Sequence, residues 1–94
     1  MLNEENKKLC WEVLSKFGIA NQMDMVIEEC AELQKAVCKL FRKETEERFE
    51  NFIEEIVDVI VVCQQMLLNM GVSMNEVNTR AKAKLERALK DECS

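Results

Sequence analysis

Two long segments of the sequence, 21–41 and 45–70, carry apolar residues at the spacing of an amphipathic α-helix. No proline interrupts either segment, and the two glycines, Gly18 and Gly71, fall where helices are expected to end. The polar connection between the segments is so short that it can only join antiparallel neighbours. The pattern therefore predicts an all-α fold built on a central antiparallel helical hairpin.

The sequence on either side of the hairpin predicts two further helices. One runs from 3 to 17, and the other follows Gly71 and frays near 91–94. No linker or low-complexity segment divides the chain, so we expect a single domain covering 1–94. The predicted N-terminal caps of the last three helices are Asn21, Thr45, and Ser73 with Glu76 as a capping box.

Composition and charge exclude several classes of protein. The chain has no histidine and five scattered cysteines, which argues against a zinc site and against a disulfide framework. Its net charge of −5 makes the chain a poor candidate for binding a nucleic-acid polymer through phosphates. The longest apolar run, 59–63, is too short to cross a membrane, and the N-terminus lacks the pattern of a signal peptide. We expect a cytoplasmic protein that does not associate with membranes.

Two acidic residues occupy positions inside the apolar faces of the hairpin helices. An α-helix turns about 100° per residue. On that geometry Glu29 lies among the apolar residues of the first hairpin helix, and Glu55 lies among those of the second. Each is followed three residues later by another acid at the margin of the same face, Glu32 and Asp58. The same anomaly thus occurs on two successive helices.

The spacing of these four acids predicts that they meet. Glu32 and Glu55 are equally far from the middle of the connection, and so are Glu29 and Asp58. In a helical hairpin such residues come level on facing surfaces. Four partly buried carboxylates would repel one another and raise their pKa values. A hard divalent cation that prefers oxygen ligands, Mg²⁺ or Mn²⁺, would remove the conflict, and we predict a metal site there.

The same residues carry a resemblance to a known enzyme family. The motif Glu28-Glu29-Cys30-Ala31-Glu32, twenty-two intervening residues and Glu55-Ile56-Val57-Asp58 resemble the EExxE…ExxD signature of the MazG-like nucleoside triphosphate pyrophosphohydrolases, the all-α NTP pyrophosphatases. The resemblance covers the two hairpin helices well and the outer two only in outline.

The resemblance implies a four-helix module that assembles as a homodimer or a dimer of dimers. It implies that Glu29, Glu32, Glu55 and Asp58 hold Mg²⁺. It also implies cleavage of the α–β phosphoanhydride of a (d)NTP, giving the nucleoside monophosphate and pyrophosphate, in a house-cleaning role. From the residues themselves, a chain without histidine has no Ser/His or Cys/His nucleophile, so a metal-activated water is the expected attacker. Glu28 or one of the four ligands could accept its proton.

Further polar residues are candidates for contacts with the nucleotide, although each also suits a solvated helix face. Relatives in the family often carry a glutamine near Gln22, and many carry a basic pair where Lys84 and Arg87 stand. Trp11 could stack on a base, but a lone tryptophan on an amphipathic helix is more often a core or interface residue. The remaining candidates, which lie along or beside the acidic faces, are Lys35, Lys39, Arg48, Asn51 and Asn69.

Three other interpretations compete with a hydrolase. A di-iron carboxylate bundle needs Glu-x-x-His pairs, which the chain lacks. A non-catalytic helical module, such as a phage-encoded or antitoxin-like regulator, could keep the fold without the activity. A purely structural bundle could pair the acids with basic residues of another subunit. The apolar faces of the hairpin helices span nearly half the circumference, which favours a homodimer that covers them.

Overall fold

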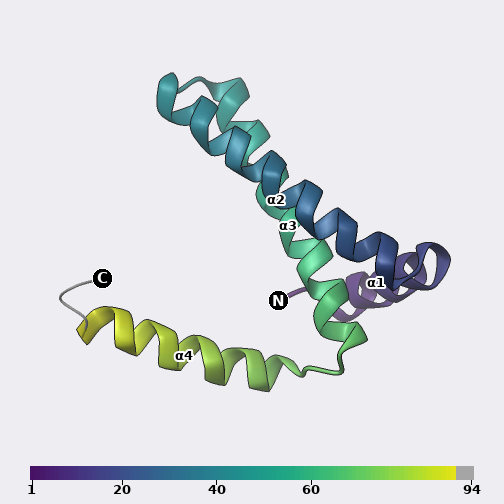
Figure 1. Cartoon of the computed structure of the whole chain (residues 1–94). Coiled ribbons are helices and arrows are strands. Elements are labelled where there is room, and N and C mark those ends of the chain that lie inside the picture. Colours follow the sequence, from purple (N-terminus) through teal and green to yellow (C-terminus); the bar gives the residue numbers. More distant parts are fainter. Residues whose placement is uncertain (91–94) are drawn as a thin grey trace.

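The computed structural model describes residues 1–90, and within that range it is all-helical (Figure 1). No strand occurs among these residues, which confirms the predicted fold class. Cys93 and the predicted fraying near 91–94 lie outside the described residues. The helices are α1 (Glu4–Phe17), α2 (Ile19–Arg42), α3 (Glu46–Asn69) and α4 (Met74–Lys90).

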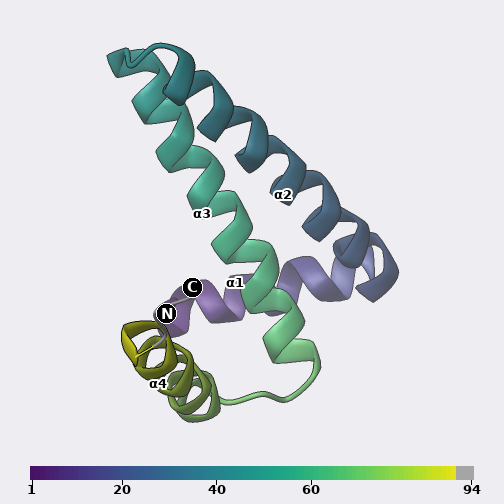
Figure 2. The same cartoon turned by 60° about the vertical axis from the view of Figure 1, so that its left-hand side comes forward.

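Helices α2 and α3 form the predicted antiparallel hairpin, and α1 crosses its open end (Figures 1 and 2). Residues equally far from the middle of the bend meet across it. Near the open end, the Gln22 side-chain amide donates to Gln65 Oε1 at 2.5 Å. Near the bend, the Arg48 guanidinium donates to the Lys39 carbonyl at 2.7 Å. The register predicted from the sequence is therefore confirmed.

The start of α2 differs from the prediction, which placed its cap at Asn21. The helix already begins at Ile19, and Asn21 lies inside its first turn. The reason is Gly18, whose φ of 85° and ψ of 156° reverse the chain within one residue. Its N–H donates to the Leu14 carbonyl at 2.9 Å, and its own carbonyl accepts from the Gln22 N–H at 3.1 Å. A single glycine thus ends one helix and begins the next.

The other two predicted caps are present. Thr45 Oγ1 accepts from the backbone N–H of Arg48 at 3.1 Å, and Ser73 Oγ accepts from that of Glu76 at 3.1 Å. The capping box at the start of α4 is half formed, because the Glu76 carboxylate pairs with Arg80 at 2.7 Å. These short polar bonds explain why α3 and α4 begin where they do.

The core is small and partly polar. Its buried apolar side chains are few, and three glutamines are buried with them. The Gln64 Oε1 atom has no hydrogen-bond partner among the described residues. The buried residues, which belong to α1, α2 and α3, are Cys10, Leu14, Ala36, Val62, Gln22, Gln64 and Gln65.

Helix α4 stands apart from the other three. Within residues 1–90 it packs against no other helix, and none of its residues is buried (Figure 2). The radius of gyration is 15.6 Å, whereas a compact chain of this length has about 12 Å. No single described helix has the length and apolarity of a membrane span, and α3 and α4 meet that test only as a pair bent by 118°. The chain therefore consists of a three-helix body and a projecting fourth helix.

Candidate functional site

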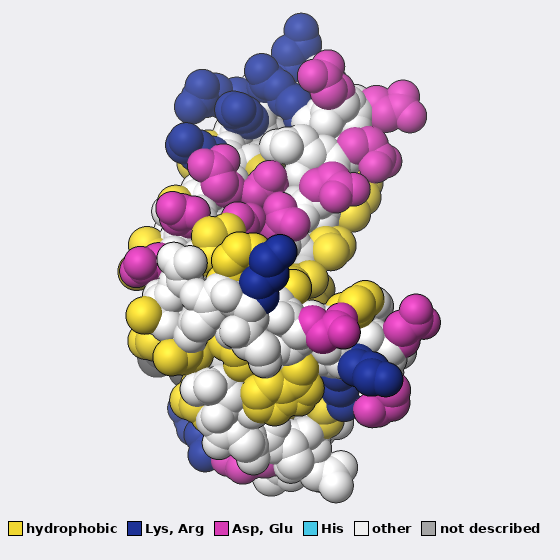
Figure 3. All heavy atoms as spheres, turned by 90° about the vertical axis from the view of Figure 1, so that its right-hand side faces the viewer, with side chains coloured by type: hydrophobic (Ala, Val, Ile, Leu, Met, Phe, Trp, Pro, Cys, Tyr) yellow, Lys and Arg dark blue, Asp and Glu magenta, His cyan; other side chains and the backbone are white. Residues whose placement is uncertain are grey.

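Three of the predicted acids come together in the middle of the hairpin. Glu29 of α2 and Glu55 and Asp58 of α3 each place a carboxylate oxygen within 4.8 Å of the others. We call these three residues the acidic cluster. Glu29 and Glu55 are half-buried because their helices pack along this seam, whereas Asp58 is exposed at its edge. In Figure 3, acidic side chains gather in the upper half of the molecule, below the bend.

The acidic cluster concentrates negative charge that nothing in the described chain neutralises. Burial, above all, raises the pKa of Glu29, and the charge of Asp58, a hydrogen bond to it and the charges of Glu55 and Glu32 raise it further. No lysine or arginine of residues 1–90 forms an ion pair with the three carboxylates. The seam is therefore a site where a cation would be stabilised.

Glu32, the fourth predicted ligand, lies outside the acidic cluster. Its carboxylate is 3.6 Å from Lys35 Nζ, and both side chains are largely exposed. The reason is its position at the margin of the apolar face, which allows the side chain to turn toward solvent. Its charge still acts on Glu29, so it is close to the site without being part of the oxygen group.

The donor set of the acidic cluster suits a hard divalent cation. All three donors are carboxylate oxygens, which Mg²⁺ and Mn²⁺ prefer. Opposite ligands of an octahedral Mg²⁺ lie about 4.2 Å apart. Because neighbouring ligands lie closer together, about 3 Å apart, the oxygens, which lie within 4.8 Å of one another, have to draw together around the ion. Three carboxylates also leave coordination positions for water or for phosphate oxygens.

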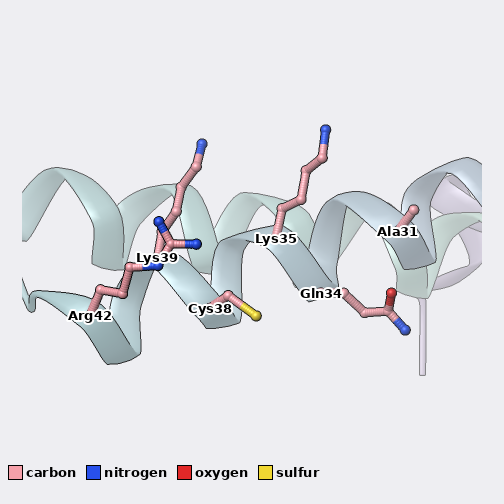
Figure 4. A pocket seen from close by; sticks show the side chains of 6 residues that line it. All are labelled: Ala31, Gln34, Lys35, Cys38, Lys39 and Arg42. Atoms are coloured by element: carbon pink, nitrogen blue, oxygen red, sulfur yellow. The ribbon is translucent and has the colours of Figure 1, made fainter.

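A basic surface lies between the acidic cluster and the bend. Lys35, Lys39 and Arg42 of α2, which we call the basic ridge, line one shallow pocket. Figure 4 shows Lys35 and Lys39 extending to the same side of the helix. In Figure 3, one group of dark blue side chains lies at the bend end, next to acidic ones. The hairpin therefore presents positive and negative surfaces side by side.

Two residues predicted to contact the nucleotide have structural partners instead. Gln22 is buried and its amide is bonded to Gln65. The Arg48 guanidinium donates to the carbonyls of Lys39 and Lys43, at 2.7 and 3.3 Å. Because these are carbonyls at the end of α2, Arg48 stabilises the C-terminus of that helix.

The other predicted residues are exposed and dispersed. Asn69 is at the last turn of α3, about 16 Å along the helix from Asp58. Lys84 and Arg87 lie on α4, which does not pack against the hairpin. The exposed candidates that remain are Glu28 and Asn51 on the hairpin and Trp11 on α1.

Sequence reasoning did not single out Gln65 or Arg42, although a signal for each was present. Gln65 is as far from the middle of the bend as Gln22, so the hairpin register could have paired them. Arg42 follows Lys35 and Lys39 at spacings of seven and three residues, which place all three on one side of α2.

Comparisons with known proteins give no further identification. The sequence matches no protein-family model, and neither curated proteins nor solved structures gave a match. The likeness to the MazG-like enzymes therefore rests on the motif residues of α2 and α3.

Proposed function

We propose that this protein is a Mg²⁺-dependent nucleoside triphosphate pyrophosphohydrolase. It would convert a (d)NTP to the monophosphate and pyrophosphate, in a house-cleaning role, with Mn²⁺ as a possible substitute for Mg²⁺. The observation that carries the proposal is the acidic cluster, whose three carboxylate oxygens lie within 4.8 Å of one another without a basic partner in the described chain. The resemblance of the motif to the MazG-like enzymes supports it.

In this proposal the acidic cluster holds the cation. When bound, Mg²⁺ neutralises phosphate charge and lowers the pKa of a water. Glu32 remains the proposed fourth ligand, and it would have to release Lys35 to reach the ion. Glu28 is exposed one residue before Glu29, and it or one of the ligands would accept the proton of the attacking water.

The basic ridge supplies what the acidic cluster alone lacks. A triphosphate carries several negative charges, which the carboxylates repel. Lys35, Lys39 and Arg42 offer positive charge on the neighbouring part of the hairpin. In this proposal the basic ridge binds the phosphates, and the acidic cluster would hold the cation that neutralises the remaining phosphate charge.

A non-catalytic binding module is the second candidate function. The observation that favours it is the amount of exposed apolar surface, which includes large side chains on all four helices. Such surface is typical of an interaction site. The two candidates share a fold and differ in whether the acidic cluster turns over a substrate.

The test is an assay of pyrophosphate release by the full chain, with a panel of NTPs and dNTPs plus Mg²⁺. Glu29→Gln and Asp58→Asn should abolish turnover, because each removes a proposed ligand of the cation, while circular dichroism shows unchanged helix content. Glu47→Gln, an exposed substitution on α3 outside the cluster, is the matched control and should retain activity. Activity that survives in both ligand variants would remove the cluster from the mechanism. No turnover of any nucleotide would favour the binding module.

A further inference from the structure

Glu32 is the proposed ligand that is turned away from the acidic cluster. Its carboxylate lies 3.6 Å from Lys35 Nζ. Because residues of an α-helix advance by about 100°, Glu32 lies halfway around α2 between Glu29 and Lys35, about 60° from each. A carboxylate at this position can turn either toward the acidic cluster or toward Lys35.

The backbone already places Glu32 beside the acidic cluster. Glu32 is one turn from Glu29 on the same helix, a spacing at which side chains can meet. It is also as far from the middle of the bend as Glu55, which belongs to the facing helix. The charge of Glu32 contributes to the raised pKa of Glu29, in agreement with a short distance between the two carboxylates. Glu32 can therefore join the cluster by rotating its side chain, without movement of the helix.

The ion pair that holds Glu32 outward can be exchanged for other partners. The side chains of Lys35 and Glu32 are 68% and 51% exposed. An exposed ion pair stabilises one arrangement only slightly, because water and salt screen both charges. A stronger partner for either side chain would therefore open the pair.

Lys35 is also part of the basic ridge. It lines the same shallow pocket as Lys39 and Arg42, and Figure 4 shows Lys35 and Lys39 extending to one side of the helix. Within residues 1–90, Lys39 and Arg42 form no ion pair, so Lys35 is the member of the ridge that has an acidic partner. A phosphate group on the ridge would compete with Glu32 for Lys35, because its several oxygens accept charge-assisted hydrogen bonds.

The outward position of Glu32 suits a cluster that holds no cation. A fourth carboxylate turned inward would add to the repulsion that already raises the pKa of Glu29. The ion pair with Lys35 avoids that repulsion. The inward position becomes favourable when a cation is present and Lys35 has another partner.

We propose that Lys35 is a positioning residue, which holds Glu32 away from the acidic cluster until a phosphate group on the basic ridge replaces Glu32 as its partner. Glu32 then turns inward and completes the set of four carboxylates. The proposal rests on the proposed function, because it assigns a cation to the acidic cluster and phosphate to the basic ridge. It follows that each ligand strengthens the binding of the other, since a coupling between two sites acts equally in both directions.

The first test measures the binding of Mn²⁺ alone to the full chain, by electron paramagnetic resonance of the free ion and without any nucleotide. Lys35→Gln should lower the dissociation constant about two- to fivefold, because Glu32 is released. Lys35→Arg keeps the ion pair and should bind Mn²⁺ like the wild type. Lys39→Gln is the matched control, since it removes the same charge from the ridge without breaking an ion pair of the described chain, and its effect should be smaller.

The same substitution is then repeated in a chain that also carries Glu32→Gln. No carboxylate remains to be released there, so the effect of Lys35→Gln should fall to that of Lys39→Gln. An equally large effect in both backgrounds would overturn the proposal, because Lys35 would then act through its charge alone. A Lys35→Gln variant that binds Mn²⁺ no more tightly than the wild type would overturn it too. Circular dichroism should show unchanged helix content, since both side chains are largely exposed.

The second test uses sulfate, at constant ionic strength, as a probe of the phosphate half of the coupling. Sulfate should lower the Mn²⁺ dissociation constant of the wild type but not that of Glu32→Gln. An equal effect in both proteins would mean that the anion acts on the cation without Glu32, and no effect in either would mean that the coupling is absent. Both results would overturn this proposal alone, because Mn²⁺ still binds. A wild type that binds no Mn²⁺ would overturn the proposed metal site together with this proposal.

Discussion

At the scale of single residues, Glu29 is where local pattern and electrostatics conflict. Its backbone position belongs to the apolar face that builds the hairpin, so folding removes its carboxylate partly from water. Asp58 and Glu55 then add like charge at short range. Folding without a cation therefore favours the protonated form of Glu29, and a bound cation would favour the charged form.

This conflict predicts how stability depends on pH when no divalent cation is present. Because the pKa of Glu29 is raised in the folded protein, the folded state binds its proton more tightly than the unfolded state. Its contribution to the free energy of unfolding is full below the unfolded pKa and is lost as pH rises through the folded pKa. Urea unfolding in EDTA across that range should show this loss in the wild type and a smaller one in Glu29→Gln. Identical profiles for the two proteins would contradict the prediction.

The adjacent buried residues Gln64 and Gln65 should respond oppositely to the same substitution. Gln65 accepts a hydrogen bond from Gln22, so Gln65→Met leaves a buried amide unpaired and should lower the free energy of unfolding by about 1–3 kcal/mol. The Gln64 Oε1 atom has no partner in the described chain, so Gln64→Met should raise stability by up to about 1 kcal/mol. Each residue is the other's control, since their exposures are 1% and 2%. Denaturant unfolding of both variants tests the prediction, and equal losses would contradict it.

At the scale of the helices, the features that could be predicted were those set by local chemistry. Thr45 and Ser73 cap their helices as expected, because a side-chain oxygen three residues before an N–H is a local arrangement. The prediction of Asn21 as a cap was wrong, because Gly18 adopts a positive-φ backbone conformation that allows the second helix to begin directly after it. The residue type permits that conformation, but the sequence alone does not show that it is adopted.

The candidate site was predictable to the extent that it follows the hairpin register. Equal distance from the bend placed Glu29 opposite Asp58, and the structure brings them together with Glu55. The same argument placed Glu32 there as well, but side-chain direction at the margin of a helix face depends on which neighbour it meets. Lys35 on the same helix is that neighbour. The register of the hairpin depends on the backbone alone, whereas the final positions of the carboxylate oxygens also depend on the side-chain conformations.

Arg48 gives a prediction at this scale, because it connects the end of α2 to the beginning of α3. Its guanidinium donates to the carbonyls of Lys39 and Lys43, which lie at the C-terminus of α2. Arg48→Ala should lower the free energy of unfolding by about 1–2 kcal/mol through the loss of these charge-assisted bonds. Lys39→Ala, which removes a solvated side chain and keeps the backbone carbonyl, should change it by less than about 0.5 kcal/mol. Denaturant unfolding measures the change in the free energy of unfolding for both variants. Equal changes would mean that the loss comes from removing a positive charge and not from the hydrogen bonds of Arg48.

At the scale of the whole molecule, the sequence predicted four helices but not where the last one goes. The apolar positions of α4 are the same whether the helix folds onto its own body or onto another chain. The direction of α4 follows from the connection after α3, where Gly71 has a φ of 70° and Val72 and Val77 line the same hollow. These residues carry a recognisable Schellman and cap signature, but that signature does not give an angle. The placement of α4 is therefore a three-dimensional result that pattern alone could not supply.

Cation binding should be visible in the cooperative unfolding of the whole chain. A ligand that binds only the folded state at a hundred times its dissociation constant adds about 2.7 kcal/mol. For a domain of this size that corresponds to a rise in Tm of roughly 10 °C or more. Mg²⁺ or Mn²⁺ should produce such a rise in the wild type and in Glu47→Gln, but little or none in Glu29→Gln and Asp58→Asn.

The increase in Tm caused by the cation should also become larger as the pH rises, since protons and the cation compete for Glu29 and its neighbours. Calorimetry with and without EDTA at several pH values measures it. A Tm that does not change at millimolar metal, or that changes equally in the ligand variants, would contradict a metal centre in the acidic cluster. A rise in Tm confined to proteins with the intact acidic cluster would show that the bound cation offsets the repulsion at Glu29, which lowers stability when no metal is present.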